Sequence, residues 1–512
     1  MNSNYIVLDG ENVSISDIVK IGRFGYQAVL SENAAEKIRK SRAVVERIVE
    51  TETRTYGINT GFGRLSTVAI SKEDNDQLQR NLIMSHSTGL GPCFSTEIVR
   101  SMMALRINAL ARGISGVRPE TLNTLLEMLN KGVHPCVPER GSVGASGDLC
   151  PLSHMVLPMI GLGKAEYRGE ILDGAEAMKR AGIDVITLKA KEGLALNNGT
   201  CAMMAAGVLA TYDALVAMKT ADIALSLSLE ALEGVIDAFD PRIHESRPHK
   251  GQIDCAANVR SITRGSTMIT RQGEKRIQDA YSLRCAPAVH GASRDAIRYV
   301  EGIVTTEINS VTDNPLIFES DDNAHAVSGC NFHGQPIAVA MDILGMVLAE
   351  ICDISERRLE RMINPALNNG LPAFLTEDSG LNSGFMQIQF PAASTVSENK
   401  VLAHPACVDS IPTSGNQEDH VSMGTISARK AKTISTHTLE LLALELMTAA
   451  QAVDFRGIDR LSPVTRKVYD LIRSEIPHVD DDVYMYPLMM KAVDMVKDER
   501  ILKTVEAELE LW

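Results

Sequence analysis

The chain has 512 residues, of which 45% are hydrophobic and 23% charged, proportions typical of an ordinary globular protein. Its 51 lysines and arginines against 65 aspartates and glutamates give a net charge of −14, and no basic run interrupts the sequence. This balance argues against a nucleic-acid partner, because phosphate neutralisation needs a clustered basic face, and it disfavours binding to an anionic membrane.

The N-terminus and the cysteines predict a reduced, cytoplasmic compartment. Residues 1–5 lack the basic start and apolar stretch of a signal peptide, and no uninterrupted apolar run of about 18 residues predicts a membrane span. The nine cysteines are scattered and show no Cys-x-x-Cys spacing, and the twelve histidines include no His-Glu-x-x-His. We therefore expect neither a disulfide framework nor a metal centre.

The first elements read as a hairpin and a helix. Tyr5 to Ile15 predicts a short hairpin with Asp9-Gly10 as its turn, and a helical pattern runs from Ser31 to near Thr53. The following loop, Tyr56 to Gly63, has three glycines and two aromatic residues. Such a loop is either a mobile segment that covers a site or a plain connection between helices.

The next segments alternate between helices and short polar stretches. His86 stands among small residues, Pro119 opens a helix, and Gly132 closes it. Residues 149–161 are apolar enough for a buried helix, and residues 167–170 predict a second small hairpin.

The rest of the chain is rich in helix-forming residues. Long helices are expected over residues 208–233, 344–354 and 427–453. The last of these is apolar around most of its circumference between Leu439 and Leu446, which predicts burial in a bundle or in an oligomer interface.

These patterns predict a mainly α fold. We expect a smaller N-terminal region over residues 1–205, with a glycine loop and minor β hairpins, and a long-helix bundle over residues 206–512. No linker or low-complexity tract divides the chain, so the two regions are expected to form one continuous catalytic unit.

The segment Gly141 to Asp148 has the most specific chemistry. No large side chain shields Ala145-Ser146-Gly147, and the open amide nitrogen of Gly147 can attack the Ala145 carbonyl carbon if the fold compresses the loop. Loss of water from the ring and from Ser146 would give a methylidene-imidazolone, a strong electrophile. The ordinary alternative is a turn. A phosphate loop needs Gly-Lys-Ser/Thr, and a hydrolase elbow needs Gly-x-Ser-x-Gly; neither is present.

Four further segments carry unusual polar groups: residues 197–200, 278–284, 331–336 and 416–420. Each also has a packing explanation, such as a helix cap at Asn198, a salt bridge at Arg284 or an acidic first helix turn at Glu418. Adjacent acidic and histidine side chains at 418–420 rarely aim at one ion, so they do not predict a metal site.

Together these segments carry a family resemblance. Ala145-Ser146-Gly147-Asp148 resembles the prosthetic-group loop of the aromatic amino acid lyases, which comprise histidine, phenylalanine and tyrosine ammonia-lyases and related aminomutases. Six segments occur in the family's order with its loop lengths, namely those around Tyr56, Ser146, Asn198, Tyr281, Phe332 and Glu418.

Two positions resemble the histidine branch most closely. His86 is followed by a small residue, and Glu418 stands where the phenylalanine branch carries an amide. A carboxylate favours a charged or strongly hydrogen-bonded imidazole, whereas phenylalanine would leave it desolvated and unpaired. Three positions depart from the usual family pattern: Asn197, Cys150 and Gly415.

The resemblance implies conversion of L-histidine to trans-urocanate and ammonia, the first step of histidine degradation. It implies a 4-methylidene-imidazol-5-one (MIO) group formed autocatalytically from Ala145, Ser146 and Gly147, no metal, and a homotetramer with shared active sites. It assigns acid–base roles to Tyr56 and Tyr281. It assigns substrate contacts to His86, Asn198, Gln278, Arg284, Phe332, Met386 and Glu418.

Two alternatives stay open. A tyrosine or phenylalanine ammonia-lyase or an aminomutase would share the loop and differ only in ring contacts. A non-catalytic helical scaffold would keep Ser146 unmodified.

Overall fold

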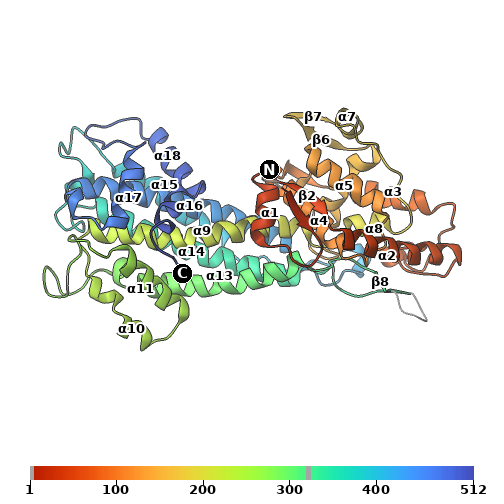
Figure 1. Cartoon of the computed structure of the whole chain (residues 1–512), viewed down its shortest axis with the longest axis horizontal. Helices are drawn as coiled ribbons and strands as arrows, with labels where there is room; N and C mark the ends of the chain where they lie inside the picture. Colours follow the sequence, from red (N-terminus) through yellow and green to blue (C-terminus); the bar gives the residue numbers. More distant parts are fainter. Residues whose placement is uncertain (1–4, 319–324) are drawn as a thin grey trace. The chain divides into compact units, whose positions relative to one another are not determined.

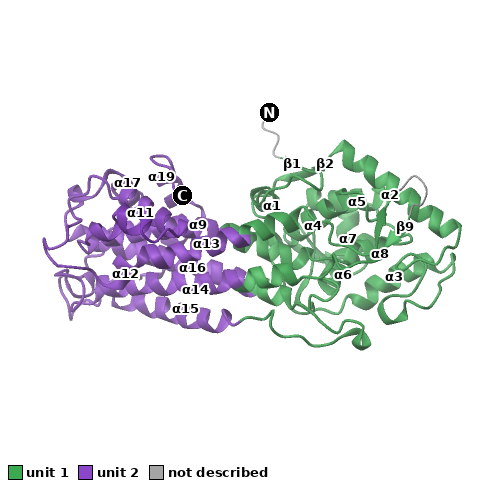
Figure 2. Ribbon diagram, turned by 90° about the horizontal axis from the view of Figure 1, so that it is seen from below, with its two compact units in different colours: residues 1–212, 301–342, 405–429 green, residues 213–300, 343–404, 430–512 purple. Residues whose placement is uncertain are grey.

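The computed structural model describes residues 5–318 and 325–512 (Figure 1). The chain folds into two compact units (Figure 2). Unit 1 takes in residues 1–212, 301–342 and 405–429, and unit 2 takes in the remainder. Residues 1–4, on which part of the signal-peptide prediction rests, lie outside the described residues.

Unit 1 combines helices with small sheets. Its elements are β1 (Tyr5–Leu8), α1 (Ile15–Gly22), β2 (Gln27–Leu30), α2 (Glu32–Glu50), η1 (Gly63–Leu65), α3 (Asn75–His86), β3 (Leu90–Cys93), α4 (Thr96–Ala111), α5 (Pro119–Lys131), β4 (Val133–Pro135), β5 (Pro138–Arg140), α6 (Leu149–Val156), η2 (Leu157–Ile160), β6 (Lys164–Tyr167), β7 (Glu170–Asp173), α7 (Gly174–Arg180), α8 (Glu192–Asn197), β8 (Leu316–Phe318), β9 (His325–Val327) and η6 (Ser414–Asn416).

Unit 2 is helical in its described residues. Its elements are η3 (Ile236–Phe239), α10 (Pro241–Glu245), α11 (Lys250–Ile262), α12 (Tyr281–Arg284), η4 (Ala373–Leu375), η5 (Met386–Ile388), α15 (Gln389–Leu402), η7 (Ile458–Arg460), α17 (Pro463–Arg473), α18 (Tyr486–Lys497) and α19 (Arg500–Glu506). The unit boundaries fall inside four long helices, α9 (Cys201–Ala231), α13 (Ala286–Ile308), α14 (Gln335–Ile363) and α16 (Gly424–Asp454).

The mainly α, long-helix prediction is confirmed, and the helix ends follow local chemistry. Helix α2 begins after Ser31, whose side chain accepts the N–H of Ala34. Helix α5 starts at Pro119 and ends before Gly132, which has a φ of 76°, a left-handed conformation that glycine adopts without strain.

The predicted hairpin over residues 5–15 is wrong. Strand β1 pairs in parallel with β2, and α1 lies between them in the sequence. The cause is a capping box: the Ser14 side chain accepts the N–H of Asp17, and the Asp17 carboxylate accepts the N–H of Ser14, so a helix begins at Ile15. The second predicted hairpin is confirmed as the antiparallel pair β6–β7, which β4 extends to three strands.

Helix α9 is long and apolar enough to cross a membrane by length and composition, and 89% of its most apolar window is buried inside the structure. A helix that is apolar all round and covered by protein belongs to a core. The same holds for the stretch Leu439 to Leu446 of α16, in which the chain itself buries every residue except the half-buried Glu440.

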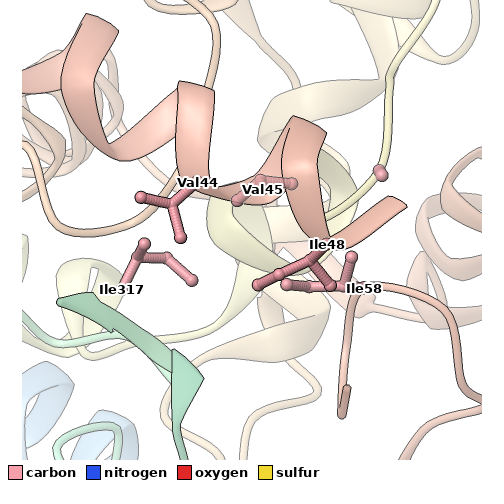
Figure 3. Packing of buried hydrophobic residues seen from close by; sticks show 6 residues of the cluster. Val44, Val45, Ile48, Ile58 and Ile317 are labelled. Carbon is pink, nitrogen blue, oxygen red and sulfur yellow. The ribbon is translucent and has the colours of Figure 1, made fainter. Parts of the chain in front are cut away.

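One core cluster fixes the loop that carries Tyr56. Val44, Val45 and Ile48 of α2 pack with Ile58 and with Ile317 of β8 (Figure 3). Ile58 is fully buried, so the glycine-rich segment 56–63 is anchored at its third residue. Burying one such side chain contributes about 2 kcal/mol, which favours a single position for the backbone that carries Tyr56.

Candidate active site

Unit 1 contains two cavities, of about 580 and 680 Å³, that share part of their lining. A volume of this size suits a small-molecule ligand. The shared lining residues are Tyr56, Gly63, Ser146, Asn198 and Glu418. His86 lines the first cavity, and Ala145 and Phe332 line the second.

The glycine loop is held by a close main-chain approach. Gly147 has a φ of 69°, and a Cβ built on it would lie 2.1 Å from the carbonyl oxygen of Gly199. The N–H of Gly199 donates to the carbonyl oxygen of Ser146 at 3.3 Å, and that of Asp148 donates to Gly199 at 2.7 Å. Both glycines are therefore required, which explains why the loop and the Asn-Gly segment occur together.

Asp148 anchors the glycine loop of residues 141–148 through its side chain. Its fully buried carboxylate accepts from Ser142 Oγ at 2.8 Å, from the N–H of Met203 at 2.7 Å and from the Thr425 hydroxyl. Burial raises the pKa of Asp148, while these donors oppose the rise. Sequence reasoning missed this role; the signal for it was an acidic residue at the junction between a small-residue loop and a helix.

Glu418 meets the loop through its carboxylate. Ser146 Oγ donates to Glu418 Oε1 at 2.8 Å, and Thr413 Oγ1 donates to Glu418 Oε2 at 2.7 Å. Sequence reasoning also missed Thr413, since a threonine five residues before a glutamate carries no recognisable signal.

Tyr56 lines both cavities, and His86 lines the first. Tyr56 Oη accepts the N–H of Gly63 at 3.3 Å. Burial raises the pKa of the Tyr56 phenol and the charge of Glu418 adds to the rise, while the Gly63 N–H opposes it. Burial also lowers the pKa of His86, which favours its neutral ring, although the Glu418 carboxylate acts in the opposite direction.

Asn198 presents an unsatisfied group. Asn198 is 5% exposed, and its Oδ1 has no hydrogen-bond partner among the described residues.

Three positions depart from the usual family pattern, and the first of them is Asn197. Its side chain donates from Nδ2 to Ser153 Oγ of α6 at 3.0 Å. Gly415 has a φ of 61°, a conformation that explains a glycine there. Cys150 is buried, and its Sγ lies 2.6 Å from where a Cβ on Gly141 would be.

The remaining predicted site residues belong to unit 2 and line neither cavity. Tyr281 is 70% exposed, and the Arg284 guanidinium lies 4.6 Å from the centroid of its ring. Gln278 is exposed and Met386 is half-buried. Within unit 1, the predicted residues that line the two cavities are Tyr56, His86, Ala145, Ser146, Asn198, Phe332 and Glu418.

One buried group in unit 2 has metal-ligand chemistry. Asp222, Cys255 and His290 place their ligand atoms within 4.8 Å of one another. The Asp222 carboxylate already accepts from His290 Nδ1 at 2.8 Å and from Arg294 at 2.6 Å. Burial raises the pKa of the Cys255 thiol well above its usual range. A guanidinium beside the carboxylate and a protonated thiol favour a structural hydrogen-bond network over a cation site.

Comparison with known proteins agrees with the geometry of the loop. The model of the aromatic amino acid lyase family matches residues 13–474. The chain is 58% identical to histidine ammonia-lyase 2 of Fusobacterium nucleatum, over 98% of each chain, and 54% identical to histidine ammonia-lyase of Alkaliphilus oremlandii, over 99% of each.

Solved structures are similar over nearly the whole chain. The histidine ammonia-lyase of Trypanosoma cruzi matches with a TM-score of 0.92 and 41% identity, covering 99% of this chain and 96% of that one. The tyrosine aminomutase of Streptomyces globisporus matches with a TM-score of 0.95 and 36% identity, covering 99% and 100%. The family resemblance read from the sequence is thus confirmed, and the chain belongs to the aromatic amino acid lyase family.

Proposed function

We propose that this protein is a histidine ammonia-lyase, which eliminates ammonia from L-histidine to give trans-urocanate. One observation carries the choice of substrate: the Glu418 carboxylate lies at the loop residue Ser146, in a cavity that His86 also lines. An imidazole satisfies a half-buried carboxylate, whereas a phenyl ring leaves it unpaired. The relatives with the highest identities quoted above carry the same activity in their names.

The residues present fit an MIO group formed from Ala145, Ser146 and Gly147. The tripeptide has no bulky side chain, and Gly147 lies against Gly199 where only glycine fits. Asn198 lines both cavities together with Ser146, and its buried Oδ1 has no partner among the described residues. When formed, the group supplies an electrophile that makes the amine a better leaving group. Asp148 and the main chain of Gly199 would hold the loop that carries it.

The substrate ring would lie between His86 and Glu418. Burial keeps His86 neutral, so one of its ring nitrogens can accept a hydrogen bond while Glu418 accepts another. Asn198 would support the amino acid end or the prosthetic carbonyl, and Phe332 would shape the pocket from the second cavity.

Tyr56 is our proposed base for the β-proton. In the single chain its phenol has a raised pKa, so positive potential in the complete site must lower that pKa before Tyr56 can act near neutrality. Arg284, which we assign to the substrate carboxylate, would supply that potential, with Tyr281 as the second acid–base group and Gln278 and Met386 as pocket residues.

We also propose a homotetramer with shared active sites in the cytoplasm. Gln278, Tyr281, Arg284 and Met386 belong to unit 2, and we propose that a neighbouring copy supplies them, as the family resemblance implies. The cytoplasmic location is supported by nine free cysteines, several of them buried.

The test is direct. The purified protein is incubated separately with histidine, tyrosine and phenylalanine, and the ultraviolet absorbance of the unsaturated acid is followed. We expect turnover of histidine well above that of the others. Preferred turnover of tyrosine, or release of a β-amino acid, would instead identify the alternative lyase or aminomutase. A protein of unmodified mass that turns over none of them would be the non-catalytic scaffold.

A further inference from the structure

The orientation of the Glu418 carboxylate depends on a second hydroxyl. In the described part of the chain this carboxylate accepts two hydrogen bonds, Ser146 Oγ on Oε1 and Thr413 Oγ1 on Oε2. The Ser146 hydroxyl leaves as water in the function proposed above. Among the described residues of this chain, Thr413 is then the donor that remains on the carboxylate.

The main chain holds Thr413 opposite Glu418. The N–H of Thr413 donates to the carbonyl oxygen of Glu418 at 3.0 Å, and the N–H of Glu418 donates back at 3.4 Å, as in an antiparallel bridge. Between them, Ser414, Gly415 and Asn416 all have positive φ values of 54° to 63°. This left-handed turn brings the two chain segments together so that the side chains of the paired residues meet on one side.

We propose that Thr413 is a positioning residue for substrate recognition. Its hydroxyl holds Oε2 of Glu418, so that Oε1 faces the place from which the Ser146 hydroxyl departs and where the substrate imidazole binds. This role rests on the proposed function, because Thr413 acts through Glu418 and has no contact with the reacting atoms.

The hydroxyl can be removed with little change in shape. Thr413→Val loses the donor and keeps the β-branched side chain, whereas Thr413→Ser keeps the donor and loses a methyl group. A hydrogen bond to a charged group is typically worth 10-fold or more in an equilibrium, and because both residues are half-buried we expect the low end, about 10-fold.

The experiment is a double-mutant cycle measured as kcat/KM for histidine. Thr413→Val should lose about 10-fold in the otherwise unchanged protein and less than about 3-fold in a Glu418→Gln background, where the carboxylate is gone. Thr413→Ser should stay within about 3-fold of the starting protein. Thr306→Val, which removes an exposed helix hydroxyl, controls for the substitution itself. The intact mass of Thr413→Val should fall below its own sequence mass by the same two waters as that of the starting protein, and the two melting temperatures should be equal.

The outcomes separate the two proposals. If the unsubstituted protein does not turn over histidine, the proposed function is refuted and this inference falls with it. If it does, and Thr413→Val is fully active or loses the same factor with and without the Glu418 carboxylate, only the positioning role is refuted. Failure of Thr413→Ser to restore activity would also overturn it.

Discussion

Glu230 gives a prediction whose size follows from the structure. This residue lies in α9 with its carboxyl buried; the N–H of Ser462 donates to Oε1 at 2.8 Å, while Oε2 has no partner in the described residues. Burial raises its pKa from 4.5 to about 7, and the Ser462 N–H together with the nearby hydroxyls of Ser266 and Thr465 only partly opposes the rise.

The sign of the effect follows from linkage. Because the folded-state pKa is raised, the folded protein binds this proton more tightly, so the stability is fully present below the unfolded pKa and is lost as pH rises through 7. A difference of about 2.5 pKa units corresponds to about 3 kcal/mol between the two limits. Glu230→Gln keeps the acceptor for Ser462 and removes the ionisation.

Glu230→Gln should therefore be more stable than the parent at pH 8 and closer to it at pH 5. The assay is urea unfolding followed by the helical circular dichroism signal at both pH values. The matched control is Glu377→Gln, which changes an exposed carboxyl in the same unit. An advantage of equal size at both pH values, or none at pH 8, would refute the linkage argument.

Two further substitutions test the site and its support. Glu418→Gln should lower kcat/KM for histidine by roughly 10- to 100-fold, because a charge-assisted hydrogen bond becomes a neutral one. The melting temperature should stay unchanged. Parallel losses of activity and stability would indicate a structural role for Glu418. Lys191 Nζ lies 2.8 Å from Asp313 Oδ2 in a fully buried ion pair. Lys191→Met leaves the Asp313 carboxylate without its partner and should lower the free energy of unfolding by about 3–5 kcal/mol in chemical unfolding. A variant as stable as the parent would contradict a paired charge at this position.

The sequence predicts the helices better than the first sheet. Pro119 and Gly132 mark the two ends of α5 because one residue fixes helical φ and the other accepts a left-handed conformation. The pairing of β1 with β2 is not local, and the Ser14–Asp17 capping box begins a helix where the alternating pattern of residues 5–15 predicts a hairpin. Local propensity does not reveal a partner strand 22 residues further along the chain.

The candidate site shows the same division. The family resemblance singles out Ser146, Tyr56, His86, Asn198 and Glu418 because their segments occur in the family's order, and all five residues line one or both of the overlapping cavities. Their roles in the reaction stay predictions. Thr413 could not, since its role depends on a turn with three left-handed residues that folds it back on Glu418.

The formation of the MIO group is tested most directly by the intact mass of the purified protein beside that of its Ser146→Ala variant. We expect the parent to be lighter than its sequence mass by two water molecules and to turn over histidine. The variant should fold, should not lose the water that comes from the Ser146 side chain, and should have almost no activity. A parent protein of full sequence mass that still deaminates histidine, or a fully active Ser146→Ala variant, would contradict it.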